Sequence, residues 1–235
     1  MSISPGRRVA FEVLLRVAGG AYASDLLAAR SATLDSRDAG LAGEIVFGVL
    51  RYRAQIDWVI AEACGRERRL DEEVRTALRM GIYQLRYLER IPAHAAVGEA
   101  VELVKRARKG SAAGFVNAVL RKAGGRGPGT GGRGGALWEG NVASTSGAGL
   151  AGESACPTSG SWPSREIELS CPEWLLERWE RQYGEEAAAE IARAALRPPE
   201  KYFRGERMQD IGSQAIVPLL RLEAGQTFLD VCAAP

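Results

Sequence analysis

The residue types best suited to chemistry stand in the last positions of the chain, which read Phe228-Leu229-Asp230-Val231-Cys232-Ala233-Ala234-Pro235. A short apolar run that ends in an acid and then in small residues is typical of the first strand of a nucleotide-binding α/β domain as it enters its ligand-binding turn. We therefore predict a strand over residues 227–231. The glycines that would form the turn do not follow, so we expect an incomplete site here and look for function in the residues that come before.

The cysteines and the histidine offer no catalytic or metal site. No C-x-x-C pair occurs, and this favours reduced thiols in a cytosolic protein over a disulfide framework or a zinc site; the four cysteines are Cys64, Cys156, Cys171 and Cys232. His94 is the single histidine. It follows Pro92 at a predicted helix start, where it is expected to satisfy local backbone groups. We predict no metal site and no catalytic residue.

The composition is that of a globular protein with a charge asymmetry. Apolar residues make up 46% and charged residues 26% of the 235 residues. No apolar run approaches the roughly 18 residues of a membrane span, and no apolar segment follows the N-terminus as a signal peptide requires. Residues 1–125 carry 20 Lys+Arg and 14 Asp+Glu, a net charge of +6, and residues 126–235 carry 11 and 15, a net charge of −4. The basic half suggests a polyanionic partner.

Helical periodicity dominates the first 125 residues. One apolar stripe runs without interruption from Leu41 to Val59, and Asp35 or Ser36 can cap the helix that carries it. Further stripes at helical spacing cover residues 9–17, 74–88, 97–104 and 115–120, and a short helix is plausible over residues 23–30. We find no strict alternation of the kind a strand requires, so an all-α domain is predicted.

Residues 124–165 differ from this pattern, because they hold 13 glycines and few apolar side chains. Such a composition cannot form a packed core, and we interpret the segment as a flexible linker. Trp138 and Trp162 are its large side chains; each either docks on a neighbour or stays exposed.

Helical signals resume after the linker. Ser170-Cys171-Pro172-Glu173 has the spacing of a capping box and predicts a helix that Gly184 ends. A second helix is expected over residues 185–196, before Pro198, and a third over residues 210–222, weakened by Pro218.

Four segments carry a resemblance to a known family. They are Arg37-Asp38-Ala39-Gly40-Leu41-Ala42-Gly43-Glu44-Ile45-Val46-Phe47-Gly48-Val49-Leu50-Arg51, Leu78-Arg79-Met80-Gly81-Ile82-Tyr83-Gln84-Leu85, Ile91-Pro92-Ala93-His94-Ala95-Ala96-Val97-Gly98-Glu99-Ala100-Val101 and Gly114-Phe115-Val116-Asn117-Ala118-Val119-Leu120-Arg121. In this order they resemble the NusB-like RNA-binding domain, and more closely the version at the front of RsmB-type (Sun/Fmu) 16S rRNA cytosine-carbon-5 methyltransferases.

Later landmarks agree with the second version. Pro172-Glu173-Trp174-Leu175, Arg197-Pro198-Pro199, Gln209-Asp210 and the final segment look like successive parts of that enzyme. The resemblance thus implies a mainly α chain with a NusB-like domain at 1–123, a Gly/Ser-rich linker at 124–165 and a truncated, incomplete α/β remnant of the methyltransferase region at 166–235.

The resemblance also implies partners and sites. The family uses S-adenosylmethionine (SAM), whose motif would begin at Cys232, Ala233, Ala234 and Pro235, and it acts on 16S ribosomal RNA in the cytoplasm. RNA would bind basic side chains near the N-terminus and on exposed helix faces, because guanidinium and ammonium groups pair with phosphates. The nominated residues, each of which could instead be a solvated charge or an ion-pair partner, are Arg7, Arg8, Arg51, Arg53, Lys105, Arg106, Arg108, Lys109, Arg121 and Lys122.

The family's catalytic parts have no counterpart in the sequence. Its two catalytic cysteines lie beyond the SAM motif, and Cys232 belongs to that motif rather than to the catalytic pair. Only ten positions separate Pro199 from Gln209, where the family places a small α/β subdomain. We therefore expect the chain to bind RNA without catalysing methyl transfer alone, and to pack poorly over residues 200–235 or lean on the helical domain there.

Two other interpretations remain open. The chain could be a stand-alone NusB-like module for RNA binding or transcription antitermination, or a plain helical protein-interaction domain. The later landmarks favour the methyltransferase interpretation over the first, and the positive charge of residues 1–125 favours RNA over the second.

Overall fold

The computed structural model describes residues 3–65, 69–124, 162–200, 202–205, 207–221, 223–227 and 229. The chain divides into two compact units, Met1–Arg197 and Pro198–Pro235. The four positions expected to begin the SAM motif, Cys232 to Pro235, and most of the expected linker, residues 125–161, lie outside the described residues.

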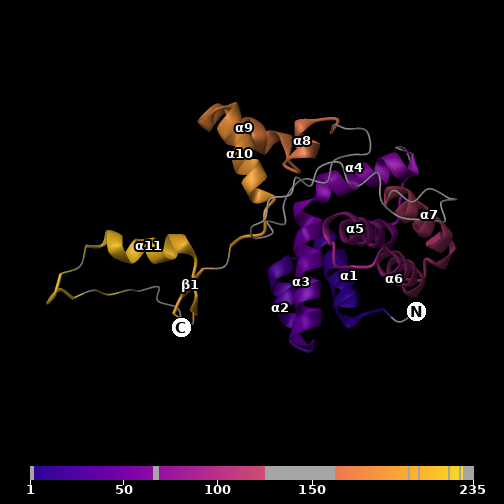
Figure 1. Cartoon of the computed structure of the whole chain (residues 1–235), viewed down its shortest axis with the longest axis horizontal. Coiled ribbons are helices and arrows are strands. Elements are labelled where there is room, and N and C mark those ends of the chain that lie inside the picture. The colour runs from indigo at the N-terminus through magenta and orange to yellow at the C-terminus, as the bar shows by residue number, and fades with distance from the viewer. Residues whose placement is uncertain are drawn as a thin grey trace. The chain divides into compact units, whose positions relative to one another are not determined.

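The first unit is helical, as the sequence predicts (Figure 1). Its helices are α1 (Pro5–Ala18), α2 (Ala23–Ser31), α3 (Ser36–Arg51), α4 (Arg53–Cys64), α5 (Glu72–Tyr87), α6 (Ala93–Arg106), the 3-10 turn η1 (Gly110–Ala112), α7 (Ala113–Ala123), α8 (Arg165–Glu168), α9 (Glu173–Tyr183) and α10 (Glu185–Ala195). None of the helices in the described part of the chain has both the length and the apolar character needed to cross a bilayer.

Local signals set several helix ends. Asp35 caps α3, because its side chain accepts a hydrogen bond from the Asp38 backbone N–H at 2.7 Å. Gly184 ends α9 with φ +86, a backbone conformation that favours glycine. Both ends are where the sequence predicts them.

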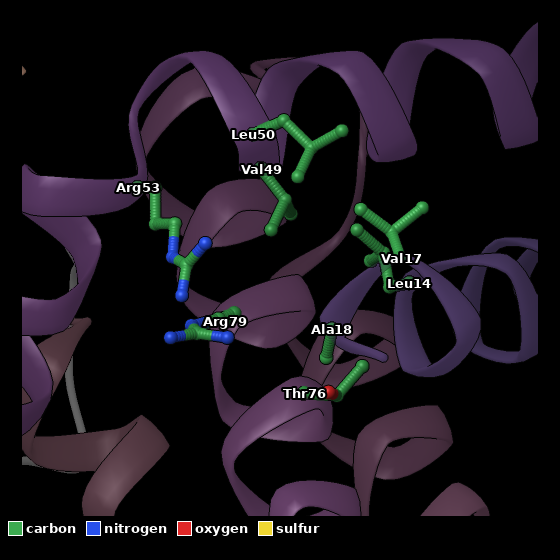
Figure 2. A pocket seen from close by; sticks show the side chains of 8 residues that line it. All are labelled: Leu14, Val17, Ala18, Val49, Leu50, Arg53, Thr76 and Arg79. Carbon is green, nitrogen blue, oxygen red and sulfur yellow. The ribbon is translucent and has the colours of Figure 1, made fainter. Parts of the chain in front are cut away.

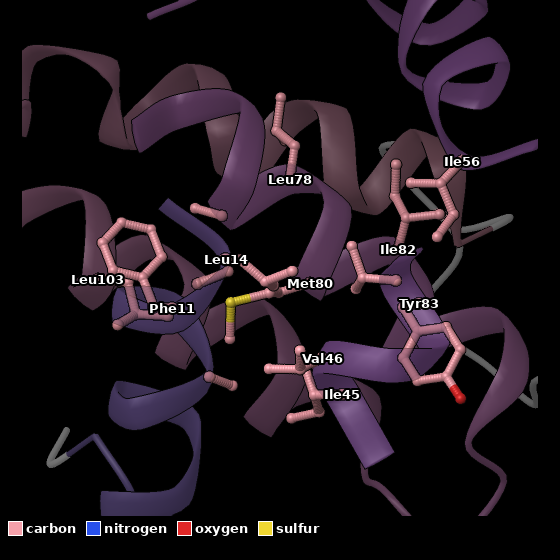
Figure 3. Close-up of a cluster of buried hydrophobic side chains, with 14 of the residues drawn as sticks. Phe11, Leu14, Ile45, Val46, Ile56, Leu78, Met80, Ile82, Tyr83 and Leu103 are labelled. Carbon is pink, nitrogen blue, oxygen red and sulfur yellow. The ribbon is translucent and has the colours of Figure 1, made fainter. Parts of the chain in front are cut away.

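The core gathers apolar side chains from all of the helices α1 to α7, and Figure 3 labels members of it from α1, α3, α4, α5 and α6. Ile45, Ile56, Leu78, Met80 and Leu120 are completely buried. Burial of each such side chain stabilises the fold by about 1.5–3 kcal/mol relative to exposure. The apolar stripes of the sequence therefore face one common interior.

Glycine allows close helix contact at Gly81. A Cβ built there would lie 2.6 Å from Leu120 Cδ2, too close to fit without movement. The absence of a side chain at Gly81 thus lets α5 approach α7.

The stripe from Leu41 to Val59 differs from expectation in one respect. It does not belong to one helix, because Tyr52 separates α3 from α4 with φ −97 and ψ 21. The apolar spacing continues across this break, since Tyr52 and Ile56 are both buried. No glycine or proline marks the break in the sequence.

Helices α8, α9 and α10 belong to the same compact unit as the first seven helices. The capping box predicted at Ser170 does not form: α9 begins after Pro172 without a side-chain cap. The Ser170 hydroxyl instead accepts a hydrogen bond from the Ala54 backbone N–H of α4 at 3.1 Å. Trp162, at the end of the expected linker, docks on Trp58 with ring centroids 5.4 Å apart.

The second unit has little interior. Strands β1 (Phe203–Arg204) and β2 (Arg207–Met208) form a two-stranded antiparallel hairpin that the sequence analysis did not predict. Helix α11 (Ile211–Leu219) contains Pro218. No described side chain of this unit is buried. Of the strand predicted over residues 227–231, Thr227 and Leu229 are described and lie in no strand; the other three positions lie outside the described residues.

Candidate nucleic-acid interface

Arg7, one of the nominated RNA contacts, is used inside the fold. Its side chain is 9% exposed, and its guanidinium donates to Glu99 Oε1 at 2.8 Å and to the Gln84 side chain. The same guanidinium donates to Ser4 Oγ at 3.1 Å. The structure therefore makes Arg7 a link between α1, α5 and α6, and its guanidinium is not available to a phosphate.

Five other nominated arginines present guanidinium groups that are open to a ligand. Arg8, Arg106, Arg108 and Arg121 are exposed, and Arg51 is half-buried. Within the described residues, no side-chain hydrogen bond or ion pair engages these five groups. Arg108 lies in the turn after α6 and has φ +61, a left-handed backbone conformation that is uncommon for residues other than glycine. Unpaired arginines on a surface can bind phosphates without first breaking an ion pair.

The nominated lysines are partly engaged. Lys105 pairs with Glu102 at 2.6 Å, and this hydrogen bond lowers the pKa of the Glu102 carboxyl. Lys109 pairs with Asp71 at 2.8 Å, which raises the pKa of the Lys109 ammonium. Lys122 points its ammonium at the carbonyl of Ala63, 3.3 Å away at the end of α4. These contacts are exposed and contribute little to stability, so a phosphate can compete with them.

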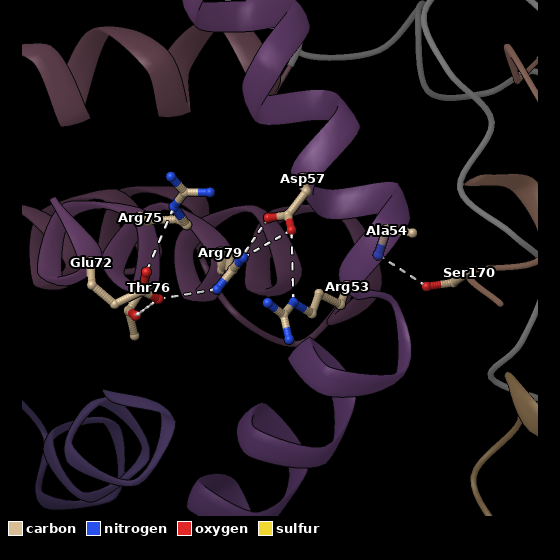
Figure 4. Close-up of polar contacts among 8 residues, drawn as sticks. All are labelled: Arg53, Ala54, Asp57, Glu72, Arg75, Thr76, Arg79 and Ser170. Atoms are coloured by element: carbon tan, nitrogen blue, oxygen red, sulfur yellow. Dashed lines mark hydrogen bonds and ion pairs between the residues drawn. The ribbon is translucent and has the colours of Figure 1, made fainter. Parts of the chain in front are cut away.

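Arg53 is exposed but has a weak partner (Figure 4). Its Nε lies 3.8 Å from Asp57 Oδ2. Asp57 is already held by Arg79, whose Nε and Nη2 donate to the two carboxylate oxygens at 2.7 and 2.9 Å. The bidentate pair with Arg79 satisfies Asp57 and leaves Arg53 free to turn outward.

The nominated residues come from several helices of the domain. Arg51, Lys105, Arg106, Arg121 and Lys122 stand in the last turns of α3, α6 and α7, where a positive charge also complements the helix dipole. Among the described residues up to position 124, the exposed arginines that were not predicted to contact RNA are Arg16, Arg37, Arg69 and Arg90. Charge alone could have flagged them, but nothing in their local sequence distinguishes them from solvated surface residues.

The described residues include a small cavity and a buried cysteine. A cavity between α1, α3, α4 and α5 has a volume of about 20 Å³, room for roughly one water (Figure 2). Arg79, on its wall, is tied to Asp57 and Glu72. Cys171 is buried, and burial raises the pKa of its thiol, which disfavours the reactive thiolate. Among the described side chains, no group of three or more His, Cys, Asp or Glu could hold a metal ion.

The helical domain identifies the family. Residues 4–124 match the NusB family, so the chain belongs to that family. This confirms the resemblance drawn from the four sequence segments, and the matched residues are those that form α1 to α7.

Curated relatives extend the likeness beyond this domain. The Bacillus subtilis protein named "Probable ribosomal RNA small subunit methyltransferase B" is 32% identical over 209 residues, which cover 86% of this chain and 41% of that protein. A "Ribosomal RNA small subunit methyltransferase B" of Thermus thermophilus is 34% identical over 186 residues, 78% of this chain and 37% of that protein. A "Ribosomal RNA small subunit methyltransferase B" of Pseudomonas putida is 38% identical over 108 residues, which cover 46% of this chain and 24% of that protein.

These matches cover only part of each relative. The chain spans less than half of each of the three relatives. The match to the Bacillus subtilis protein is longer than residues 4–124, so it includes residues after α7.

Proposed function

We propose that this chain binds ribosomal RNA, and that it is the RNA-binding N-terminal region of a SAM-dependent methyltransferase acting on cytosine carbon 5 of 16S rRNA in the cytoplasm. The NusB family match and the names of the relatives support this proposal. The observation that carries it is the set of unpaired arginines on α1, α3 and α6–α7 of the NusB-family domain, because such groups suit phosphates. The match beyond residue 124 favours this proposal over a stand-alone antitermination module.

We also propose that the described part of the chain supplies no methyl-transfer chemistry of its own. The cavity between α1, α3, α4 and α5 is too small for SAM, and Cys171 lacks the exposure and low pKa of a nucleophilic cysteine. We propose that Cys232 to Pro235 begin the SAM motif of the family. On this proposal the chain does not bind SAM alone.

Binding to fragments of 16S rRNA, measured across a salt titration, tests the first proposal. The affinity of a protein that contacts phosphates falls linearly on a log–log plot against salt, with a slope of about −0.7 per contact on a single strand. We expect the double variant Arg106→Ala/Arg108→Ala to lower the steepness of the slope by about one to two such contacts.

Arg30→Ala is the matched control, because Arg30 is bound to Glu12 and was never nominated. It should leave the salt slope unchanged. Affinity that ignores ionic strength, or an equal effect of the control, would contradict RNA binding through these arginines.

A methyl-transfer assay tests the second proposal. The chain, small-subunit rRNA and radiolabelled SAM should give no incorporation above background, and calorimetry should detect no SAM binding. Incorporation of label would contradict the proposal that the chain is inactive alone, without affecting the binding proposal.

A further inference from the structure

The junction between α3 and α4 presents neighbouring residues to opposite environments. Tyr52, the single residue between the two helices, is 6% exposed and stacks on Tyr87 with ring centroids 4.2 Å apart. Its hydroxyl donates to the carbonyl of Leu196 at 2.9 Å, directly after α10. Arg51 and Arg53, on either side of it, are half-buried and exposed, respectively. Tyr52 therefore contacts the end of α10, whereas Arg51 and Arg53 on either side of it reach the surface.

The beginning of α4 is completed by a residue from far along the chain. The first backbone N–H groups of a helix have no partner inside it and need a cap. Tyr52 provides no side-chain cap for α4. Ser170 does so instead, since its hydroxyl accepts from the Ala54 N–H (Figure 4).

Ser170 has the left-handed conformation of the turn that ends α8, in which its own N–H donates to the Ile167 carbonyl and the Cys171 N–H donates to the Glu166 carbonyl, both at 3.1 Å. Its φ is +44, in the left-handed region that favours glycine. Such a conformation costs of order 1–3 kcal/mol, and it persists where the surroundings hold it in place. The turn that ends α8 and the hydroxyl contact with Ala54 both engage Ser170 in this conformation.

Gln55 extends the contact. Its side chain is completely buried, with Nε2 donating to the carbonyl of Glu168 at 2.5 Å and Oε1 accepting from the Tyr87 hydroxyl at 2.6 Å. Trp58, one turn further along α4, meets Trp162. Three positions on the N-terminal half of α4, together with Tyr52 before it, thus contact residues between 162 and 196.

We propose that the α3–α4 junction is a two-sided joint, in which Tyr52, Ala54 and Gln55 hold α8–α10 while Arg51 and Arg53 bind RNA phosphates. RNA bound at Arg51 and Arg53 restricts the same turn of backbone that Ser170 and Leu196 contact, so RNA binding and the docking of α8–α10 stabilise each other. Such coupling is reciprocal by thermodynamic necessity. In this joint Tyr52 and Gln55 act as positioning residues. Their hydrogen bonds to Leu196 and Glu168 fix the position of α8–α10 against the RNA-binding domain. The RNA half of this inference rests on the proposed function.

Hydrogen–deuterium exchange of the full chain tests the docking half. Tyr52→Phe removes one hydroxyl but keeps the ring that stacks on Tyr87. A lost hydrogen bond of ordinary strength predicts about five-fold faster exchange in residues 165–196. Tyr83→Phe is the matched control, because Tyr83 loses a hydroxyl bonded to Glu44 and none to α8–α10. Equal exchange in the Tyr52→Phe variant and the wild type would overturn the docking half.

The same measurement with a 16S rRNA fragment tests the coupling. RNA should slow exchange in residues 165–196 several-fold more than in α6. The double variant Arg51→Ala/Arg53→Ala should exchange like the wild type without RNA and lose this additional slowing with RNA.

The outcomes separate the two proposals. Salt-dependent RNA binding with no slowing in residues 165–196 would overturn the joint and leave the proposed function standing. Absence of salt-dependent binding would overturn the proposed function and the RNA half of the joint. Slowing that persists in the Arg51→Ala/Arg53→Ala variant would overturn the assignment of the phosphate contacts to these two arginines.

Discussion

The ring of Tyr83 on α5 occupies the space that a side chain at Gly48 on α3 would need. A Cβ built at Gly48 would lie 1.9 Å from Tyr83 Cζ and 2.1 Å from its hydroxyl oxygen. That hydroxyl donates to Glu44 Oε1 at 2.6 Å, one turn earlier on α3. Tyr83 therefore lies across the backbone of α3, and its hydroxyl is anchored on the same helix.

Two glycines of α3 should respond in opposite directions to alanine. Gly48→Ala forces the Tyr83 ring to move and should lower the free energy of unfolding by about 1–3 kcal/mol. Gly43→Ala places its Cβ where nothing lies within 4 Å, and should raise that free energy by about 0.5–1 kcal/mol, because alanine favours helix over glycine. Urea denaturation measures both. A stabilising Gly48→Ala would show that Tyr83 does not cover α3 in solution.

Alanine substitutions of the adjacent arginines Arg7 and Arg8 on α1 should affect different properties of the chain. Arg7→Ala leaves Glu99 buried without its partner and should cost about 3–5 kcal/mol of unfolding free energy. Arg8→Ala changes an exposed side chain and should cost less than about 0.5 kcal/mol, while it reduces the salt dependence of RNA binding.

Arg7 needs a second variant, since Arg7→Ala could fail to fold. Glu99→Gln keeps the shape of the partner, and it should also destabilise the chain while leaving the salt slope unchanged. If a folded Glu99→Gln or Arg7→Ala protein showed a shallower dependence of RNA affinity on salt, Arg7 would contact RNA after all.

The buried tyrosines should make the fold sensitive to alkali. Burial raises the pKa of Tyr52, Tyr83 and Tyr87 above the ordinary value of 10.0, and the hydrogen bond to Glu44 adds to the effect at Tyr83. Above pH 10 the unfolded chain therefore binds fewer protons than the folded one, and the free energy of unfolding falls as pH rises. The slope is up to about 1.4 kcal/mol per pH unit for each tyrosine.

Urea titrations between pH 8 and 11 measure this slope. The stabilising contribution of the three tyrosines is complete below pH 10. Tyr83→Phe/Tyr87→Phe removes two of the ionising groups and should make the decline shallower than in the wild type. An identical decline in both proteins would mean that these hydroxyls do not resist ionisation.

The Cys171 thiol should react slowly with alkylating reagents. Its burial, and secondarily the charge of Glu166, raise the pKa, so little thiolate exists near pH 7.5. We expect iodoacetamide to modify Cys171 at least about ten-fold more slowly in the folded chain than in urea, followed by mass spectrometry of the peptide. Equal rates would indicate that residues 165–196 leave the domain freely.

The periodic part of the fold could be predicted because it depends on local signals. Apolar stripes, the cap at Asp35 and the left-handed Gly184 define helices and their ends within a few residues of sequence. The break at Tyr52 could not be predicted in this way. The apolar spacing passes through it unchanged, and Ser170, which caps the start of α4, lies 116 positions away from Ala54.

The candidate site was predictable in composition and not in detail. Positive charge pointed to the surface of α1 to α7, but the sequence does not tell a buried arginine from an exposed one. Arg7 and Arg8 are neighbours of the same type, and the difference between them comes from Glu99 and Gln84 on other helices. Ser170 has the spacing of a local cap, yet its hydroxyl serves another helix.

The single-residue separation of α3 and α4 has a consequence for how this protein can change in evolution. One inserted or deleted residue at Tyr52 would rotate α4 by about 100° relative to α3. Gln55 would then turn away from Tyr87, and Asp57 from Arg79, which hold their present partners through side-chain hydrogen bonds. Substitutions in this stretch can be absorbed one at a time, whereas a codon gained or lost would break every one of these contacts at once.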